Sequence, residues 1–250
     1  MTFTKTRFTF FRALALCAPL AILAIASPAR ADFIGAIQID FQSGDQAGSY
    51  SFVLPGDQDP YTWALPSPVS VYSDTNQLIG TIRGLDVELN GDPGVSLGFF
   101  VTATAATTHI TVTSSLVSFG AIVNPLAFAS AGITVTDNDS DGASVTGLYP
   151  ASLAYQANYN GSSVFTNLVS PISAGIDSSA TISDRFPLAG FSSIAGAVTS
   201  IQTQFDFMLS PNDSASGTSR FTVVVPEPAS VVLALLGAAA VAIVARRRRE

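Results

Sequence analysis

The stretch IQTQFDFML, residues 201–209, alternates in polarity with a period of two residues. The side chains at odd positions, from Ile201 to Leu209, would share one face of an extended chain. The polar side chains of Gln202, Gln204 and Asp206 would share the other. Successive side chains of a β-strand point to opposite faces of its sheet, so this pattern predicts a strand with one buried and one wet face.

Similar alternation recurs from Asp32 to Val225, in about ten short segments separated by turn-forming clusters such as Pro55-Gly56-Asp57. It predicts an all-β body at residues 32–225, an antiparallel β-sandwich, with a jelly-roll topology as one form of it. Residues 164–170 and 191–200 are weak candidates for helices. The sequence has neither an internal repeat nor a long linker to divide the body, which favours one domain.

The net charge of −7 for 250 residues is unevenly distributed. The predicted body holds 16 acidic residues and only three basic ones, Arg83, Arg185 and Arg220. Nucleic-acid binding through phosphate neutralisation requires clustered lysine and arginine on the folded part, so this class of function is excluded. The body also lacks cysteine, and its size allows a core that needs no disulfide.

The first 31 residues have the layout of a secretory signal peptide. A basic start precedes an apolar run, residues 13–26, and the small residues Ala29 and Ala31 form an A-x-A site before Asp32. We therefore expect cleavage by signal peptidase between Ala31 and Asp32. An N-terminal anchor helix is the less favoured alternative, because the run is short for a membrane span.

At the other end, residues 229–245 form an uncharged apolar run. Four consecutive basic residues follow it directly: Arg246, Arg247, Arg248 and Arg249. At about 1.5 Å per residue a helix of this length just spans a thin hydrocarbon core, which predicts a single transmembrane helix. The arginine cluster places the tail in the cytoplasm and the acidic body outside. A buried C-terminal helix of the body is the alternative.

Pro226, Glu227 and Pro228 stand just before this apolar run. The two prolines interrupt strand and helix, and leave an exposed hinge. The order of this tripeptide, the Leu/Ala/Gly-rich span and the arginine cluster resembles the PEP-CTERM sorting signal of exported proteins in Gram-negative bacteria. The resemblance covers residues 226–250. It implies processing by a membrane-embedded exosortase, transient anchoring in the inner membrane, and residence at the cell surface or in extracellular polymer, often alongside exopolysaccharide and biofilm production.

One local pattern in the body has the chemistry of a metal site. Asp137, Asp139 and Asp141 alternate with other residues and precede Gly142, like the first half of a calcium loop. A complete EF-hand would need a glutamate where Leu148 stands, so that interpretation fails. A calcium-supported loop between strands remains, and an acidic solvated turn is the alternative.

No residue set in the body indicates catalysis. His109 is the only histidine and is predicted to lie on a strand, and the sequence has no G-x-S-x-G motif to place a nucleophile beside it. Glu88 is the body's only glutamate, and nothing in the sequence selects an aspartate to pair with it as a glycosidase requires. We expect no enzymatic activity; a secreted hydrolase is the weakest alternative.

Aromatic residues suggest a second kind of function. Tyr61 and Trp63 fall in a predicted loop, and three further tyrosines cluster later: Tyr149, Tyr155 and Tyr159. Exposed aromatic side chains could stack on sugars, and packing at the sandwich edges is the alternative. The sequence thus predicts an exported structural or adhesive surface protein, with a lectin-like, glycan-binding module as the rival and extracellular polysaccharide as a partner.

Overall fold

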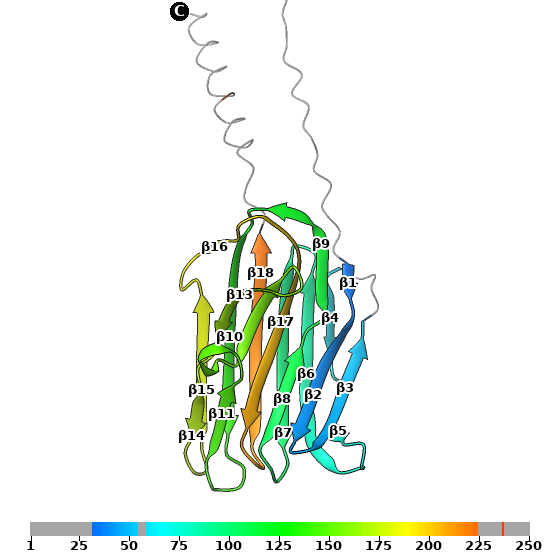
Figure 1. Cartoon of the computed structure of the whole chain (residues 1–250), viewed down its shortest axis with the longest axis vertical. Helices are drawn as coiled ribbons and strands as arrows, with labels where there is room; N and C mark the ends of the chain where they lie inside the picture. Colours follow the sequence, from blue (N-terminus) through cyan, green and yellow to red (C-terminus); the bar gives the residue numbers. More distant parts are fainter. Residues whose placement is uncertain (1–31, 55–58, 225–236, 238–250) are drawn as a thin grey trace, which may run out of the picture.

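The computed structural model describes residues 32–54, 59–224 and Gly237. Within this part, two antiparallel β-sheets pack face to face, in agreement with the predicted all-β sandwich (Figure 1). The ten-stranded sheet has the order β1-β9-β17-β8-β2-β3, with β11 to β14 paired beside this path. The eight-stranded sheet has the order β15-β10-β18-β7-β6-β4, with β5 and β16 at its sides.

The strands of the ten-stranded sheet are β1 (Asp32–Ile34), β2 (Ala36–Ser43), β3 (Gln46–Val53), β8 (Thr108–Thr113), β9 (Leu116–Val123), β11 (Ala143–Gly147), β12 (Tyr155–Tyr159), β13 (Ser163–Leu168), β14 (Ile172–Ala174) and β17 (Ala197–Leu209). The eight-stranded sheet consists of β4 (Tyr61–Ala64), β5 (Val69–Tyr72), β6 (Leu78–Asn90), β7 (Gly94–Ala103), β10 (Leu126–Thr136), β15 (Ser179–Phe186), β16 (Ser192–Ser193) and β18 (Ser214–Val224). A short 3-10 turn, η1 (Pro150–Ser152), joins β11 to β12.

The alternation in residues 201–209 is confirmed as a strand with one buried face. Phe205 and Phe207 on β17 are both fully buried and meet Phe99 of β7 across the two sheets, with ring centroids 4.9 and 5.7 Å apart. Ring contacts of this kind add to the burial of apolar area that holds two sheets together. The core therefore lies between β17 and β7; Gln202, Gln204 and Asp206 lie on the outer face of β17, whereas Thr203 is buried on the inner face.

The two weak helix candidates were wrong. Residues 164–170 belong mainly to β13, and residues 191–200 contain β16 and the start of β17. β13 pairs with β12, the strand just before it in the chain, and the start of β17 pairs with β9, so strand pairing decided the conformation of both segments.

In the described residues, no helix is long and apolar enough to cross a membrane. The predicted signal peptide, residues 1–31, and all but Gly237 of the predicted span, residues 229–245, lie outside this part of the chain. The predicted domain bounds and the jelly-roll topology stay predictions.

The chain enters and leaves the sandwich at the same end, which we call the entry pole (Figure 1). β1 begins there at Asp32, and β18 ends there at Val224. β10 runs antiparallel to β18, with Leu126 opposite Val224 and Thr136 opposite Ser214. The loop after β10 therefore lies at the opposite end, the far pole, roughly 33 Å away at about 3.3 Å per strand residue.

Candidate functional site

The far pole carries an acidic cluster. The carboxylate oxygens of Asp137, Asp139 and Asp213 all lie within 4.8 Å of one another. Asp137 follows β10 and Asp213 precedes β18, and the pairing of Thr136 with Ser214 brings these two strand ends side by side. The structure thus brings together two of the three predicted calcium ligands and adds Asp213, which is fully buried.

Asp137 organises the loop that contains the cluster. Its Oδ1 accepts hydrogen bonds from the amides of Asp139 at 3.2 Å and Ser140 at 3.1 Å, and its Oδ2 accepts one from Asp177 at 2.6 Å. Burial works to raise the pKa of this carboxyl group, but backbone hydrogen bonds, that from Asp177 foremost, bring the pKa below its ordinary value. Asp137 is therefore held in its charged form by the backbone around it.

The third predicted ligand, Asp141, lies next to this group. A hydrogen bond with the Asp139 carboxyl group, the charge of Asp139 and burial raise the pKa of Asp141, and the charges of Asp213 and Asp137 raise it further. Negative charges at short range disfavour one another's ionised form. The far pole thus concentrates carboxylates that repel each other.

Asp213 is the member of the cluster that sequence reasoning missed. Its Oδ1 accepts a hydrogen bond from the amide of Asn138 at 3.2 Å, and its Oδ2 accepts one from the Ser210 hydroxyl at 2.5 Å. In the sequence it looks like one residue of an ordinary Pro-Asn-Asp turn, and only the register of β10 against β18 connects it to the loop. Each carboxylate oxygen of Asp213 accepts one of these hydrogen bonds and keeps a second lone pair, and clustered carboxylate oxygens are the donors that Ca²⁺ prefers. The donor set of this cluster therefore fits a calcium ion.

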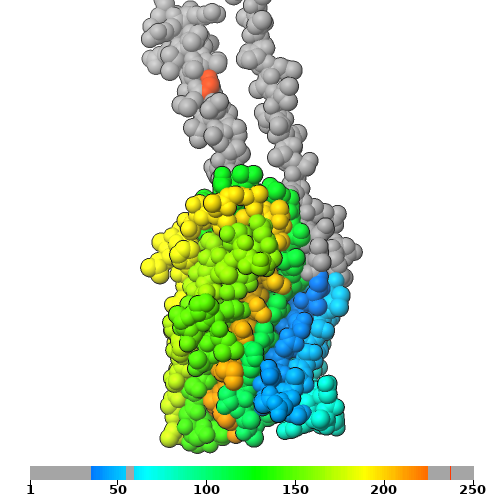
Figure 2. All heavy atoms as spheres, viewed as in Figure 1, coloured from blue at the N-terminus to red at the C-terminus, as the bar shows by residue number. Residues whose placement is uncertain are grey.

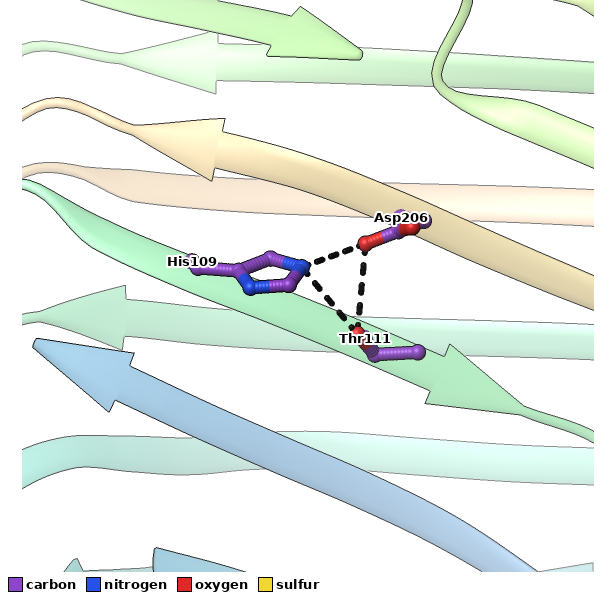
Figure 3. Close-up of polar contacts among 3 residues, drawn as sticks. All are labelled: His109, Thr111 and Asp206. Carbon is purple, nitrogen blue, oxygen red and sulfur yellow. Dashed lines mark hydrogen bonds and ion pairs between the residues drawn. The ribbon is translucent and has the colours of Figure 1, made fainter. Parts of the chain in front are cut away.

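His109 lies on the outer face of the ten-stranded sheet and forms the one ion pair found in the described residues. Its Nε2 is 2.5 Å from Oδ1 of Asp206, and the Thr111 hydroxyl lies 3.2 Å from that oxygen and 3.3 Å from Nε2 (Figure 3). In a catalytic triad the acid and the nucleophile lie on different ring nitrogens of the histidine. Here the Asp206 carboxylate oxygen and the Thr111 hydroxyl oxygen both contact Nε2. This arrangement favours the interpretation of His109 as an ordinary strand residue over that of a general base in hydrolysis.

The face that carries His109 is built from segments far apart in the sequence. Figure 2 shows that β2 and β3, from the N-terminal part of the chain, lie on this surface beside β8 and β17, which come much later in the sequence. Asp206 lies directly opposite Thr111 in the pairing of β17 with β8. A hollow of about 350 Å³ opens next to His109 and is also lined by Asp40 and Asp74.

The aromatic side chains that were predicted to stack on sugars mostly pack against other residues of the sandwich. Tyr61 is buried in the core, and Trp63 is half-buried and stacks on Phe52, with ring centroids 4.2 Å apart. Because Phe52 belongs to β3 and Trp63 to β4, this stack joins the edges of the two sheets.

The later tyrosines also pack inward. Tyr155 is fully buried against Phe205, and burial raises its pKa. Burial and the charge of Asp206 raise the pKa of Tyr149, whose hydroxyl is enclosed. Tyr159 is half-buried at the end of β12. These positions match the packing alternative, and none of the three presents a fully exposed ring.

The residues of the predicted sorting signal lie outside the described part of the chain, as do Ala29 and Ala31 of the cleavage site. The sorting residues concerned are Pro226, Glu227, Pro228, Arg246, Arg247, Arg248 and Arg249. The comparison with protein families nevertheless identifies this region: residues 224–249 match the family model of the PEP-CTERM protein-sorting motif. The match agrees with the resemblance found in the sequence and is consistent with an exosortase substrate.

Two other comparisons add little. A search of curated proteins found no match. Among solved structures, a chain in the structure of infectious bursal disease virus, Gx strain, is similar with a TM-score of 0.24 and 10% identity, over 80% of this chain and 58% of the viral chain. The chain therefore spans less than two thirds of that viral chain.

Proposed function

We propose that this chain, which carries a PEP-CTERM protein-sorting motif at residues 224–249, is an exported protein that an exosortase sorts to the cell surface or the extracellular matrix. There its β-sandwich has a structural or adhesive role and no enzymatic one. The observation that carries the proposal is the match to the sorting motif, which begins at Val224, the last residue of β18.

The composition of the body supports an extracellular role. It is acidic and lacks cysteine and lysine, and a net charge far from zero keeps a protein soluble. The arrangement of His109, Thr111 and Asp206 on a single ring nitrogen supports the non-enzymatic part of the proposal.

We also propose that calcium stabilises the far pole. Support comes from the three carboxylates within 4.8 Å and from the buried carboxylate of Asp213. Burying a charged carboxylate costs free energy unless a nearby opposite charge compensates it. A cation bound between these carboxylates would provide that charge. A role for calcium suits a protein that works outside the cell, where calcium modules of modest affinity are common.

The sorting proposal is tested in the native host by fractionating cells into membrane, matrix and medium and measuring the intact mass of the protein in each. We expect a surface or matrix form that begins at Asp32 and lacks all four arginines, Arg246, Arg247, Arg248 and Arg249. Glu227→Ala should retain the tail and accumulate in the membrane fraction. Glu88→Ala, the same change in the body, should be processed like the parent. A surface form that keeps the four arginines would contradict removal of the tail.

A further inference from the structure

The outer face of the eight-stranded sheet contains a trough that crosses five strands. Its floor is a row of cross-strand neighbours, one each from β15, β10, β18, β7 and β6: Ser183, Gly132, Thr218, Gly98 and Asp86. Two hollows, of about 640 and 260 Å³, lie along this row and share Gly132, Ser183 and Thr218. They therefore form one continuous depression.

The glycines keep the floor low. A β-carbon at Gly98 would collide with the carboxylate of Asp86, so the glycine leaves room for that carboxylate over the floor. At Gly132 a β-carbon would come within 3.1 Å of the carbonyl oxygen of Ile182. Larger side chains at these two positions would fill the trough or push its neighbours apart.

One wall of the trough carries two of the body's three arginines. Arg185 of β15 and Arg220 of β18 lie opposite Ser130 of β10, on its two sides, in the strand register. Both guanidinium groups lie over the ring of Phe128, at 4.8 and 5.9 Å from its centre. Such cation–π contacts hold a cation in place while leaving its donors free for a ligand.

Neither arginine forms an ion pair in the described residues, although Arg220 lines a small hollow together with Glu88 and Asp92. Arg185 donates to the carbonyl oxygen of Gly190 at 3.0 Å, and Arg220 donates to the Thr222 hydroxyl at 3.3 Å. The one ion pair in the described part of the chain is that of His109 with Asp206, on the other sheet. The two guanidinium groups are exposed and have no carboxylate in ion-pair contact in the described residues, so their donors are available to an anionic ligand.

The shape and lining of the trough select a class of ligand. Hydroxyl groups of Ser183, Thr218, Thr134 and Ser216 line it, and Asp86 stands at its other end. Hydroxyls and carboxylates pair with sugar hydroxyls, and guanidinium groups pair with sugar carboxylates. Five strands at about 4.8 Å spacing give a length of roughly 19 Å, enough for a short run of linked sugars.

A peptide fits this surface less well. Peptides that bind to sheets usually add a strand to a free edge. The floor strands β10, β18 and β7 are each paired on both sides, so their backbone groups are already used.

We propose that this trough binds a polysaccharide whose sugars carry carboxylate groups, with Arg185 and Arg220 holding the carboxylates and Asp86 accepting from hydroxyls. The inference rests on the proposed function only in placing the protein where such a polymer occurs. Binding by purified protein is independent of sorting, so a failure of one leaves the other intact.

The test is calorimetric titration of the full chain in detergent with a four-residue galacturonate oligosaccharide and with its methyl ester, which lacks the charge. We expect the acid to bind at least about tenfold more tightly than the ester, because the ester lacks the charge that strengthens hydrogen bonds from the guanidinium groups. Arg185→Gln and Arg220→Gln should each weaken binding of the acid by about tenfold, and high salt should weaken it as well.

Arg83→Gln is the matched control, since it removes the same charge outside the lining of both hollows. Thr218→Trp, an exposed floor position, should block binding. Thermal denaturation of every variant checks that it is folded. The proposal is overturned if the folded parent does not bind the acid, if the ester binds equally well, or if Arg83→Gln weakens binding as much as the other two. It is also overturned if sedimentation shows a dimer that Thr218→Trp dissociates, because a second copy would then occupy the trough.

Discussion

Asp213 and Asp137 hold carboxylate oxygens within 4.8 Å of each other at the far pole, where β10 ends and β18 begins. Both side chains are buried, and each accepts hydrogen bonds from its neighbours. Two buried like charges this close favour any cation that can join them.

Calcium should raise the melting temperature of the full chain. For an extracellular-type site with a dissociation constant near 0.1 mM, 10 mM calcium would add about 2.7 kcal/mol to the free energy of unfolding. Asp213→Asn should remove most of this gain, because it deletes a ligand charge, and Asp45→Asn in the β2–β3 hairpin should leave it unchanged. Differential scanning calorimetry in chelator and in calcium measures the difference; equal melting temperatures for the parent in the two conditions would refute the metal site.

Without calcium, Asp141→Asn should stabilise the protein near neutral pH. The folded state raises the pKa of Asp141 above 3.8, so its ionisation costs stability once the pH exceeds the raised pKa. The advantage of the variant should fade as the pH falls through that pKa, where Asp141 is protonated in the parent too.

Asp137→Asn should have the opposite effect on the free energy of unfolding and destabilise the protein near neutral pH. The folded state lowers the pKa of Asp137, so its charged form contributes stability that is present above 3.8 and lost as the pH falls through the lowered value. Urea denaturation at a series of pH values in chelator checks both variants. Identical pH profiles for the two would contradict this account of the loop.

Trp63→Ala should destabilise the sandwich rather than act on a ligand. Its ring stacks on Phe52 and joins the edges of the two sheets, and aromatic pairs contribute about 0.5–1.5 kcal/mol beyond buried area. We expect a loss of at least about 1 kcal/mol in the free energy of unfolding, and little loss for Trp63→Phe. If Trp63→Ala instead keeps its stability and loses retention on extracellular polysaccharide, the ring itself is a glycan contact.

His109→Gln should have a small effect. The ion pair with Asp206 is partly exposed, with 31% and 23% of the two side chains accessible, and pairs of this kind contribute under about 1 kcal/mol. Denaturation curves of parent and variant should nearly coincide. Hydrolysis of an ester or glycoside by the parent that disappears in His109→Gln would contradict the proposal that the protein has no enzymatic role.

The alternation of residues 201–209 was enough to predict a strand with one buried face, and its recurrence in about ten segments predicted the sandwich, because polarity with a period of two depends only on each strand and its two environments. The helix candidates failed because short segments have weak local preferences: pairing with β12 decided residues 164–170, and pairing with β10 and β9 decided residues 191–200. Asp137 and Asp139 were predictable because they share one loop.

The remaining functional candidates depend on register, which a single sequence does not reveal. Asp213 joins the acidic cluster only because Ser214 pairs with Thr136. Gly132 and Gly98 look unrelated along the chain and become neighbours of Thr218 only when β10 and β7 pair with β18. One shift of register by a single residue would turn Thr218 and Arg220 toward the core.

The entry pole has a consequence for maturation. β1 begins at Asp32, the residue that the predicted cleavage would make the first of the mature chain, and β18 ends at Val224, where the match to the sorting motif begins. Cutting the chain before Asp32 and within the Pro-Glu-Pro segment therefore breaks covalent bonds without separating any pair of strands. We therefore expect the two predicted cleavages to leave the hydrogen bonds and the core of the described sandwich unchanged.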